Sequence, residues 1–534
     1  MVNIITRREF LGRSAKTGLA VALSTLVDIP FVVKRALAEG NIGLNGKKML
    51  FIFLRGANDA LNSVIPVQDS AYNITNRPNI LIPSDPATNY GAAGSCDFPV
   101  SALAADATFK YQSAIRLGNG FAALHPALKF LAPVYNAGDL ALIHRVAYPR
   151  QSRSHFDSQN YWENGNPSDN LSKDGILYRA MVESGLANTA PLTGVSVQSS
   201  LPLMLRGSKA AMTNLTDPTR YNLLGVPNGT GDTKADNALR AANQYAFPDK
   251  NSRELLSLQY KNLTDTLKIF ESINFTDAGN TFIDDANTDN DTAPYYLFPT
   301  TNAKNGGYAL HSNDAQKYVV DTGAYGFFTN LKAAALILNK TDAIVAGTEF
   351  GGFDTHNSQG GATGAHANLQ KRIAWAMYAL KKYFTKYADK AAWDNLVVVT
   401  LSEFGRTTIQ NTSLGTDHAE AGVMFAAGGA VNGYDASTGR SGVFGCHPND
   451  SYNGQSVPWQ TGQTGSMFQA SSRYLKRAVD FRSVLGEVIR DHLGATQAQL
   501  NRIIPGYATA GESLLSGGTS SKDGVRIAGE LGIV

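Results

Sequence analysis

Four short apolar runs recur along the chain, and each leads into a cluster of glycine, charged and hydroxyl side chains. Apolar runs of roughly four to eight residues that are bounded by turn formers are typical of strands buried on both faces of a sheet. The runs that we predict to be such strands are residues 49–54, 140–146, 342–347 and 396–401.

Helical patterns lie between these runs. Residues 125–136 carry Pro126 near their start, residues 367–387 have apolar side chains three and four positions apart, and residues 481–493 end at Gly494. Proline at the first turn and glycine after the last turn are helix-boundary signals. Strands that alternate with helices predict an α/β fold whose mostly parallel central sheet has helices on both faces. Ligand-binding groups of such sheets gather at the carboxyl ends of the strands.

The composition favours one large core. Of 534 residues, 43% are hydrophobic and 17% charged, which excludes a disordered chain and a small disulfide scaffold. We predict a single domain over residues 39–534. Residues 274–313 are crowded with Asn, Asp, Thr and Gly, so we expect a cap or irregular insertion over about 190–325.

The charge balance excludes a nucleic-acid partner. The net charge is +3, and residues 1–38 contribute +4 of it, so the remainder carries −1 and has no field that attracts phosphate backbones. After this N-terminal region no apolar run reaches the ~18 residues of a spanning helix, so we expect no integral membrane span in the mature chain.

The N-terminus resembles a twin-arginine export signal. Arg7 and Arg8 precede Glu-Phe-Leu, a mildly apolar stretch covers residues 17–27, and Ala-Leu-Ala at 36–38 is a cleavage-type sequence. The alternative is an amphipathic N-terminal helix. The resemblance implies export of the folded protein through the twin-arginine translocase to a bacterial periplasm or beyond, with a mature chain that begins near Glu39.

Two cysteines, Cys96 and Cys446, are too few for a cysteine-ligated zinc or iron–sulfur site. They could pair in an oxidising compartment, but the sequence leaves their pairing open.

Two loops combine carboxylate and imidazole groups. Asp354 and His356 lie two residues apart in Gly-Gly-Phe-Asp-Thr-His and can converge on one cation; the alternative is that Asp354 caps the helix near His366. Asp417 and His418 follow in Gly-Thr-Asp-His. We expect one of them to bind a metal and the other to orient a metal ligand through a hydrogen bond; the alternative is an ordinary turn with a surface histidine.

Three further clusters complete the candidate site. Glu403 follows a strand as a possible ligand or base and Arg406 could hold an anion, although the neighbouring serine could simply cap a helix. Asp59 ends the first strand. Arg153 and Ser154 precede a histidine, but adjacent residues rarely form a nucleophile–base pair, so a serine-hydrolase dyad is not favoured. The sequence has no G-x-S-x-G, H-E-x-x-H or P-loop motif.

Eight motifs, in this order, resemble the bacterial family catalogued as domain of unknown function 1501, and they span nearly the whole mature chain. They are LRGANDALN (54–62), HPAL with LALIHRV (125–146), RSHFDSQ (153–159), GGFDTH (351–356), LSEFGRT (401–407), GTDH (415–418), GGAVNG (428–433) and VDFRSVL (479–485). That family is grouped with the alkaline phosphatase-like superfamily, so the resemblance implies an alkaline phosphatase-like three-layer sandwich.

The resemblance also implies a function. The protein would be an exported hydrolase of phosphate or sulfate esters that binds one or two divalent ions (zinc, manganese or calcium). Asp59 and Glu403 would bind one cation, and Asp354, His356 and His418 would bind the other, with Asp417 as a possible substitute ligand. Ser154 would be the nucleophile. Arg153 or Arg406 would bind the ester oxygens.

One departure from the superfamily pattern keeps a second hypothesis open. Where the superfamily tends to have Ser-Asp-His-Gly, residues 402–405 read Ser-Glu-Phe-Gly, and Phe404 cannot bind a metal. The alternative is a non-catalytic exported protein that binds a glycan or an assembly partner on a degenerate hydrolase fold. A redox enzyme that loads its cofactor before export is a third hypothesis, supported by the export signal alone.

Overall fold

A computed structural model of the chain describes residues 42–84 except 68 and 70, 113–117, 122–187, 192–217 except 211, short pieces between 265 and 303, 320–445, short strands within 451–456, and 473–534. Residues 1–38, where an export signal is predicted, lie outside the described residues, and so do Cys96 and Cys446.

All four predicted strands are present in one central sheet. They are β1 (Lys48–Leu54), β5 (Leu140–Ala147), β10 (Val345–Phe350) and β11 (Leu396–Leu401). Strand β10 begins three residues later than the apolar run suggested, because the run 342–344 forms the approach to the sheet and Thr348–Phe350 continue the pairing with β1. The α/β class with a mostly parallel sheet is confirmed.

The strand order is β15-β5-β12-β11-β1-β10-β6-β7, with β18 beside β5. The added strands are β6 (Gly194–Val197), β7 (Thr213–Leu215), β12 (Gly422–Ala427), β15 (Val443–Phe444) and β18 (Val479–Asp480). Only β12 runs against its neighbours β11 and β5; the other pairings in this sheet are parallel. The carboxyl ends of β1, β5, β10 and β11 therefore meet at one edge, and the loop 402–421 leaves and re-enters the sheet at that edge.

The range expected to be a cap or insertion contributes to the core at its beginning. Strands β6 and β7 lie inside residues 190–325, and β6 pairs with β10 in parallel register. Much of the rest of this range lies outside the described residues.

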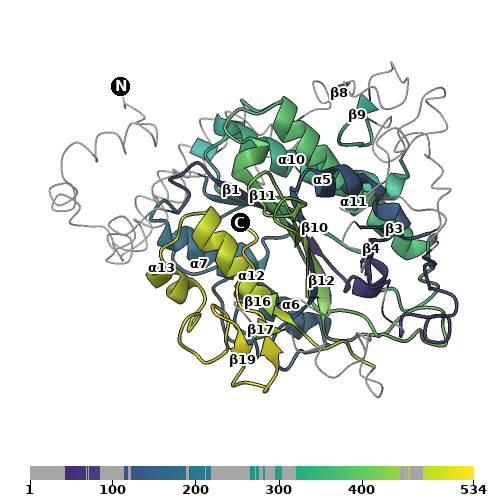
Figure 1. Cartoon of the computed structure of the whole chain (residues 1–534). Helices are drawn as coiled ribbons and strands as arrows, with labels where there is room; N and C mark the ends of the chain where they lie inside the picture. Colours follow the sequence, from purple (N-terminus) through teal and green to yellow (C-terminus); the bar gives the residue numbers. More distant parts are fainter. Residues whose placement is uncertain are drawn as a thin grey trace, which may run out of the picture.

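Helices cover both faces of the sheet (Figure 1). One side carries α5 (Ala132–Asn136), α10 (Tyr325–Lys340) and α11 (Ala365–Lys386). The other carries α6 (His155–Asn164), α7 (Ile176–Glu183), α12 (Phe481–Glu487) and α13 (Gln497–Ile503). The predicted helix at 125–136 begins as a 3-10 helix, η2 (Pro126–Leu131), and the one at 481–493 continues from α12 into a π-helical turn, η8 (Val488–His492).

The remaining short elements lie mostly in the connections. They are η1 (Ala60–Asn62), β2 (Val64–Ile65), β3 (Ile115–Arg116), β4 (Ala123–Leu124), η3 (Leu203–Leu205), β8 (Thr281–Phe282), β9 (Tyr295–Tyr296), η5 (Thr322–Ala324), η6 (Trp393–Asn395), β13 (Tyr434–Asp435), β14 (Arg440–Ser441), β16 (Ser451–Tyr452), β17 (Gln455–Ser456), β19 (Gly518–Thr519) and β20 (Arg526–Ile527).

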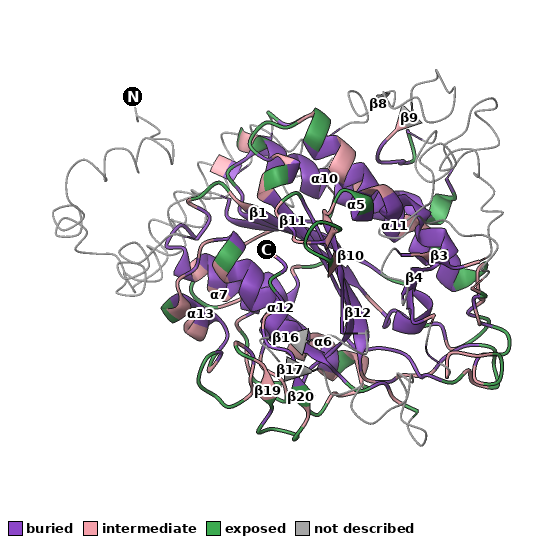
Figure 2. Cartoon of the chain, viewed as in Figure 1, coloured by how far each residue is buried: buried purple, intermediate pink, exposed green. Residues whose placement is uncertain are grey.

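The core is formed by the sheet and the inner faces of the helices (Figure 2). Every residue of β1, β5, β11 and β12 is buried, as expected for strands covered on both faces. In the described part of the chain, each helix is too short or too polar to cross a bilayer.

Buried neutral histidines make the stability of this core dependent on pH. The ring of His125 caps η2 by accepting the Ala127 N–H at Nδ1 (2.9 Å), and its Nε2 atom donates to the Gly361 carbonyl (3.0 Å). Burial, with the charge of His366, lowers the pKa of His125 to about 3, and burial lowers the pKa of His144 to about 3 as well. Protonation of His125 would place a proton on the nitrogen that accepts the cap hydrogen bond.

We therefore expect the free energy of unfolding to fall as the pH falls from about 6.5 towards 3. In that window the unfolded chain binds protons that the folded protein excludes, at a cost of about 1.4 kcal/mol per pH unit for each such histidine. The variant His125→Asn keeps a capping acceptor but does not titrate. Urea unfolding at pH 7, 6 and 5 should show a shallower loss for this variant; an unchanged slope would exclude His125 as a source of the effect.

Candidate metal centre

Four loops bring the candidate residues to the carboxyl edge of the sheet. His155 begins α6, shortly after β5, and Asp354 and His356 follow β10. His418 lies in the loop between β11 and β12. Because these strands end at the same edge, residues about 260 positions apart come into contact.

Three imidazoles and one carboxylate converge there. The Nε2 atom of His418 lies 3.0 Å from Nε2 of His155 and 2.9 Å from Nε2 of His356. Asp354 Oδ1 lies 3.0 Å from His356 Nε2 and 3.2 Å from His418 Nε2, and its Oδ2 lies 3.5 Å from His155 Nε2. Nitrogen ligands of one tetrahedral zinc ion are roughly 3.3 Å apart, so this spacing could hold a cation.

The ligand atoms of His155, Asp354 and His418 all lie within 4.8 Å of one another and form a group that could hold a metal ion. His356 contacts two members of this group and lies beside it. The structure therefore brings together three of the predicted ligands and one histidine, His155, to which the sequence alone assigned no metal.

The outer nitrogen of each imidazole is held by an acceptor. The pairs are His155 Nδ1 with Glu403 Oε1 (2.7 Å), His356 Nδ1 with Asp417 Oδ1 (3.1 Å) and His418 Nδ1 with the Arg153 carbonyl (2.9 Å). Because a carbonyl only accepts, Nδ1 of His418 carries the proton and its Nε2 presents a lone pair to the cluster. An outer carboxylate or carbonyl of this kind orients histidine ligands in metal sites.

Glu403 stands behind His155 rather than beside the other ligand atoms. Its Oε1 atom accepts from the Gly56 N–H (2.8 Å) and Gln159 Nε2 (3.0 Å) as well as from His155, whereas its buried Oε2 atom has no partner among the described residues. Burial opposes ionisation, but these donors outweigh it and lower the pKa of Glu403. The hydrogen bond to Glu403 in turn raises the pKa of His155, against the effect of burial.

Arg406 holds the loops together instead of facing an open site. Its buried guanidinium donates to Asp354 Oδ1 and to the carbonyls of Gly56 (2.7 Å) and Phe353 (2.9 Å) through Nη2. Its Nε and Nη1 atoms donate to other backbone carbonyls, so each guanidinium nitrogen has a partner within the protein. Burial raises the pKa of Asp354, but the hydrogen bond and charge of Arg406 outweigh it, and the net pKa is lowered.

Asp59 makes no hydrogen bond or ion pair with the three histidines. It is fully buried, caps η1 through the Leu61 N–H (3.1 Å), and accepts from Arg77 Nη2 (2.9 Å) and Gln359 Nε2 (2.6 Å). Burial opposes ionisation of Asp59, but chiefly the charge of Arg77 overrides it and lowers the pKa. Arg77 thus supplies the positive charge that a metal was expected to supply.

Ser154 caps α6 between two residues of the cluster. Its Oγ accepts the Asp157 N–H at 3.4 Å, which leaves its own O–H free to donate. Its neighbours are His155 and Arg153, whose carbonyl holds His418. The exposed guanidinium of Arg153 lies 4.3 Å above the Tyr474 ring.

Phe404 forms the apolar wall of the cluster. Its fully buried ring lies 4.8 Å from the ring of His155 and 4.9 Å from that of His418, measured between centroids. At this position the side chain packs against two imidazoles and limits how far they can turn.

Asp417 supports His356 from the solvent side. Its Oδ1 atom also accepts from Asn411 Nδ2 (2.9 Å), and its Oδ2 atom pairs with Arg473 Nη2 (2.5 Å). Asn411 could not be singled out from the sequence because a single amide in a loop carries no motif, and Gln159 ends the motif RSHFDSQ without a chemistry that marks it as a partner of Glu403. His155 stood in the motif RSHFDSQ directly after a strand, and that position was the signal available for it.

The comparisons with known proteins address part of the chain. No curated protein and no solved structure matched it. Residues 301–451, which contain Asp354, His356, Glu403 and His418, match the family model described as "Protein of unknown function (DUF1501)". Over this range the chain is similar to the DUF1501 family, and the match supports the family resemblance of its motifs.

Proposed function

We propose that the protein is an exported, metal-dependent hydrolase of phosphate or sulfate esters. The observation that carries the proposal is the convergence of three Nε2 atoms and the Asp354 carboxylate, with the outer nitrogen of each imidazole held by an acceptor. When all three imidazoles are neutral, their Nε2 lone pairs face one another in this cluster, and a divalent ion would satisfy them.

The donor set favours one ion of zinc or manganese type. Imidazole nitrogens with a single carboxylate suit zinc and manganese, whereas calcium prefers a shell of oxygens. Two of the carboxylates expected for a second ion have other partners: Asp59 pairs with Arg77, and Glu403 orients His155. We therefore propose a single centre on His155, Asp354 and His418, with His356 as the adjacent ligand.

When bound, a divalent ion lowers the pKa of a nucleophile and neutralises charge on the reacting oxygens. Ser154 is the nucleophile in this proposal because it lies between Arg153 and His155 and its O–H is free to donate. The exposed guanidinium of Arg153 would bind ester oxygens, whereas Arg406 orients Asp354.

One observation favours the second hypothesis, a non-catalytic binding protein on the same fold. Arg406 already balances the charge of Asp354, and His155 and His356 each have a carboxylate partner. Such a closed network of ion pairs needs no metal. Under this hypothesis Phe404 marks the loss of a ligand.

The hydrolase proposal is tested by comparing Ser154→Ala with Ser208→Ala, which removes an exposed hydroxyl between η3 and β7. With zinc or manganese supplied, the wild type should bind about one ion per chain and hydrolyse a nitrophenyl phosphate or sulfate. Ser154→Ala should retain the metal but lose activity by roughly 10²-fold or more, whereas Ser208→Ala should stay near wild type. A folded wild-type protein that takes up no metal and turns over neither ester would favour the binding protein.

The location of the protein is proposed from its N-terminal motif. Arg7 and Arg8 with the following residues support export in the folded state through the twin-arginine translocase to the periplasm or beyond. The substrate would then be an anionic ester, or a glycan under the second hypothesis, encountered outside the cytoplasm.

A further inference from the structure

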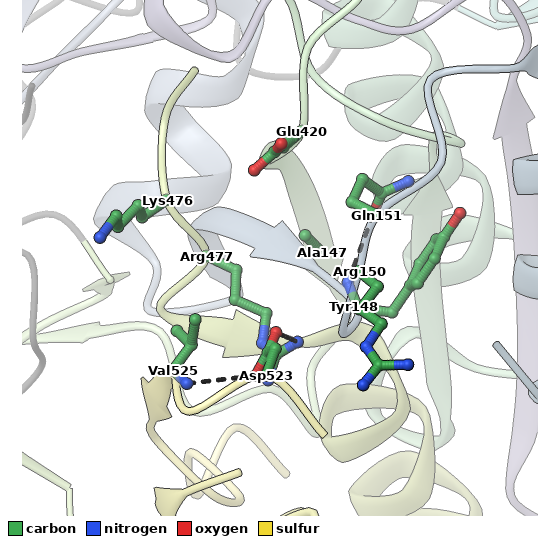
Figure 3. Close-up of a pocket in the computed structure, with 9 residues that line it drawn as sticks. All are labelled: Ala147, Tyr148, Arg150, Gln151, Glu420, Lys476, Arg477, Asp523 and Val525. Atoms are coloured by element: carbon green, nitrogen blue, oxygen red, sulfur yellow. Dashed lines mark hydrogen bonds and ion pairs between the residues drawn. The ribbon is translucent and has the colours of Figure 1, made fainter. Parts of the chain in front are cut away.

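A hollow of about 440 Å³ lies beside the loop 402–421 that also carries residues of the candidate metal centre, and Figure 3 shows the residues that line it. Its walls come from the carboxyl end of β5, from the segment before β12, from the segment before β18 and from a C-terminal loop. The lining side chains that can bind a ligand are Arg150, Gln151, Glu420, Lys476, Arg477 and Asp523.

Positive charge exceeds negative charge in this hollow. Arg477 pairs with Asp523 through two hydrogen bonds of 2.9 and 3.1 Å, so these two charges cancel. The side chains of Arg150 and Lys476 are exposed and form no hydrogen bond or ion pair within the part of the chain that the structure describes. Two unpaired cations therefore stand against the single carboxyl of Glu420.

A buried donor in the wall also lacks an acceptor. The Arg477 side chain is 3% exposed, and its Nε atom has no hydrogen-bond partner among the described residues. Buried guanidinium N–H groups are normally satisfied, so this one is an uncompensated donor enclosed in the wall, and its positive charge favours an anion in the hollow.

The backbone fixes Arg150 at this place. Its φ of 56° is a left-handed conformation that residues other than glycine adopt uncommonly. The turn is held by the hydrogen bond from the Tyr148 N–H to Gln151 Oε1 (3.3 Å). Strained residues that the surroundings hold in place concentrate at binding sites.

The hollow shares the loop 402–421 with the metal centre. Gln151 Nε2 donates to the Glu403 carbonyl (3.0 Å), and the Glu420 carbonyl accepts from the Gly405 N–H (2.8 Å). Glu420 follows His418 by two residues, so one short segment contributes to both sites. The hollow and the metal centre are therefore connected through this one loop.

We propose that this hollow is an oxyanion subsite: Arg150 and Lys476 bind a phosphate or carboxylate group of a ligand whose ester lies at the metal centre. The second half of this statement rests on the proposed function. Guanidinium and ammonium groups favour such oxyanions through charge-assisted hydrogen bonds, and Glu420 can accept from a hydroxyl of the same ligand.

The test titrates inorganic phosphate, and separately acetate, into chelator-treated protein at low ionic strength by calorimetry. The variants are Arg150→Asn, which suits the left-handed backbone, and Lys476→Gln. The control is Lys340→Gln. Lys340 is the last residue of α10, and its exposed side chain forms an ion pair with Asp389. Each pocket variant should weaken phosphate binding about tenfold, and the control should bind like the wild type.

The proposal is overturned if both pocket variants bind phosphate as the wild type does, or if the control weakens binding equally. Acetate binding with the same dependence on Arg150 and Lys476 would assign the subsite to carboxylates as well as phosphates. Thermal melts confirm that each variant is folded, and if one pocket variant does not fold, the other decides the test. If the protein hydrolyses no ester but its phosphate binding depends on Arg150, the subsite is supported and the hydrolase proposal fails. Ester hydrolysis with phosphate binding that is insensitive to both variants supports the hydrolase and overturns the subsite.

Discussion

Replacing His418 by alanine is expected to abolish metal binding. The His418 Nε2 atom lies within 3.2 Å of both neighbouring imidazoles and of Asp354, so it is the donor that links the cluster. Metal content should fall from about one ion per chain to none. A bound metal at 100 times its Kd stabilises the native state by about 2.7 kcal/mol, and the variant should lose this increment. Elemental analysis and thermal melts with and without chelator measure both effects.

The matched variant is Asp417→Asn, which weakens the orientation of His356 without removing a ligand. It should retain the metal but bind it roughly 10–100-fold more weakly. A wild-type protein whose melting is indifferent to chelator, together with a His418→Ala variant of equal stability, would mean that the imidazoles and carboxylates form a closed ion-pair network. The metal centre would then be ruled out, and the binding-protein hypothesis would remain.

Substituting alanine for Gly56 is expected to destabilise the fold more than a loop mutation ordinarily does. Gly56 has a φ of +110°, and a Cβ atom there would lie 2.5 Å from the Asp354 nitrogen and 2.9 Å from the Phe353 carbonyl carbon. The crowding atoms are backbone, so no side-chain rotation relieves them. The free energy of unfolding should fall by about 3 kcal/mol or more, because steric overlap adds to backbone strain. Urea unfolding measures the loss.

Gly46→Ala is the control for backbone strain alone. Gly46 has a φ of +75°, but nothing lies within 4 Å of its added Cβ. Its replacement should cost about 1–2 kcal/mol. If both substitutions lowered the free energy of unfolding equally, the close approach of the loop after β1 to Asp354 would contribute nothing to the loss of stability at Gly56.

The buried strands could be predicted because their signal is local. The runs at β1, β5 and β11 are apolar at most positions, since both faces of these strands are covered. Strand β12 has a similar run, but its direction depends on where its partners lie. Its antiparallel pairing with β11 and β5 follows from the course of the loop 402–421, and no property of the run itself reports it.

Some candidate ligands could likewise be predicted from local sequence, whereas the role of another depends on residues far away in the chain. Asp354, His356 and His418 were predictable because they combine ligand chemistry with a glycine-containing loop after a strand. Asp59 has the same chemistry and the same kind of position, yet it pairs with Arg77 and Gln359. Nothing local to Asp59 distinguishes these two outcomes, since Gln359 is 300 residues away.

Residue order by itself determined the element types, the parallel core and the edge at which the polar loops meet. These properties follow from hydrophobic periodicity and turn formers within short windows. Only the tertiary structure decided that His155 joins the cluster, that Glu403 stands behind it and that Arg406 holds the loops. The physical reason is that a buried polar group must find a partner, and which partner lies within hydrogen-bond distance depends on the packing of segments hundreds of residues apart.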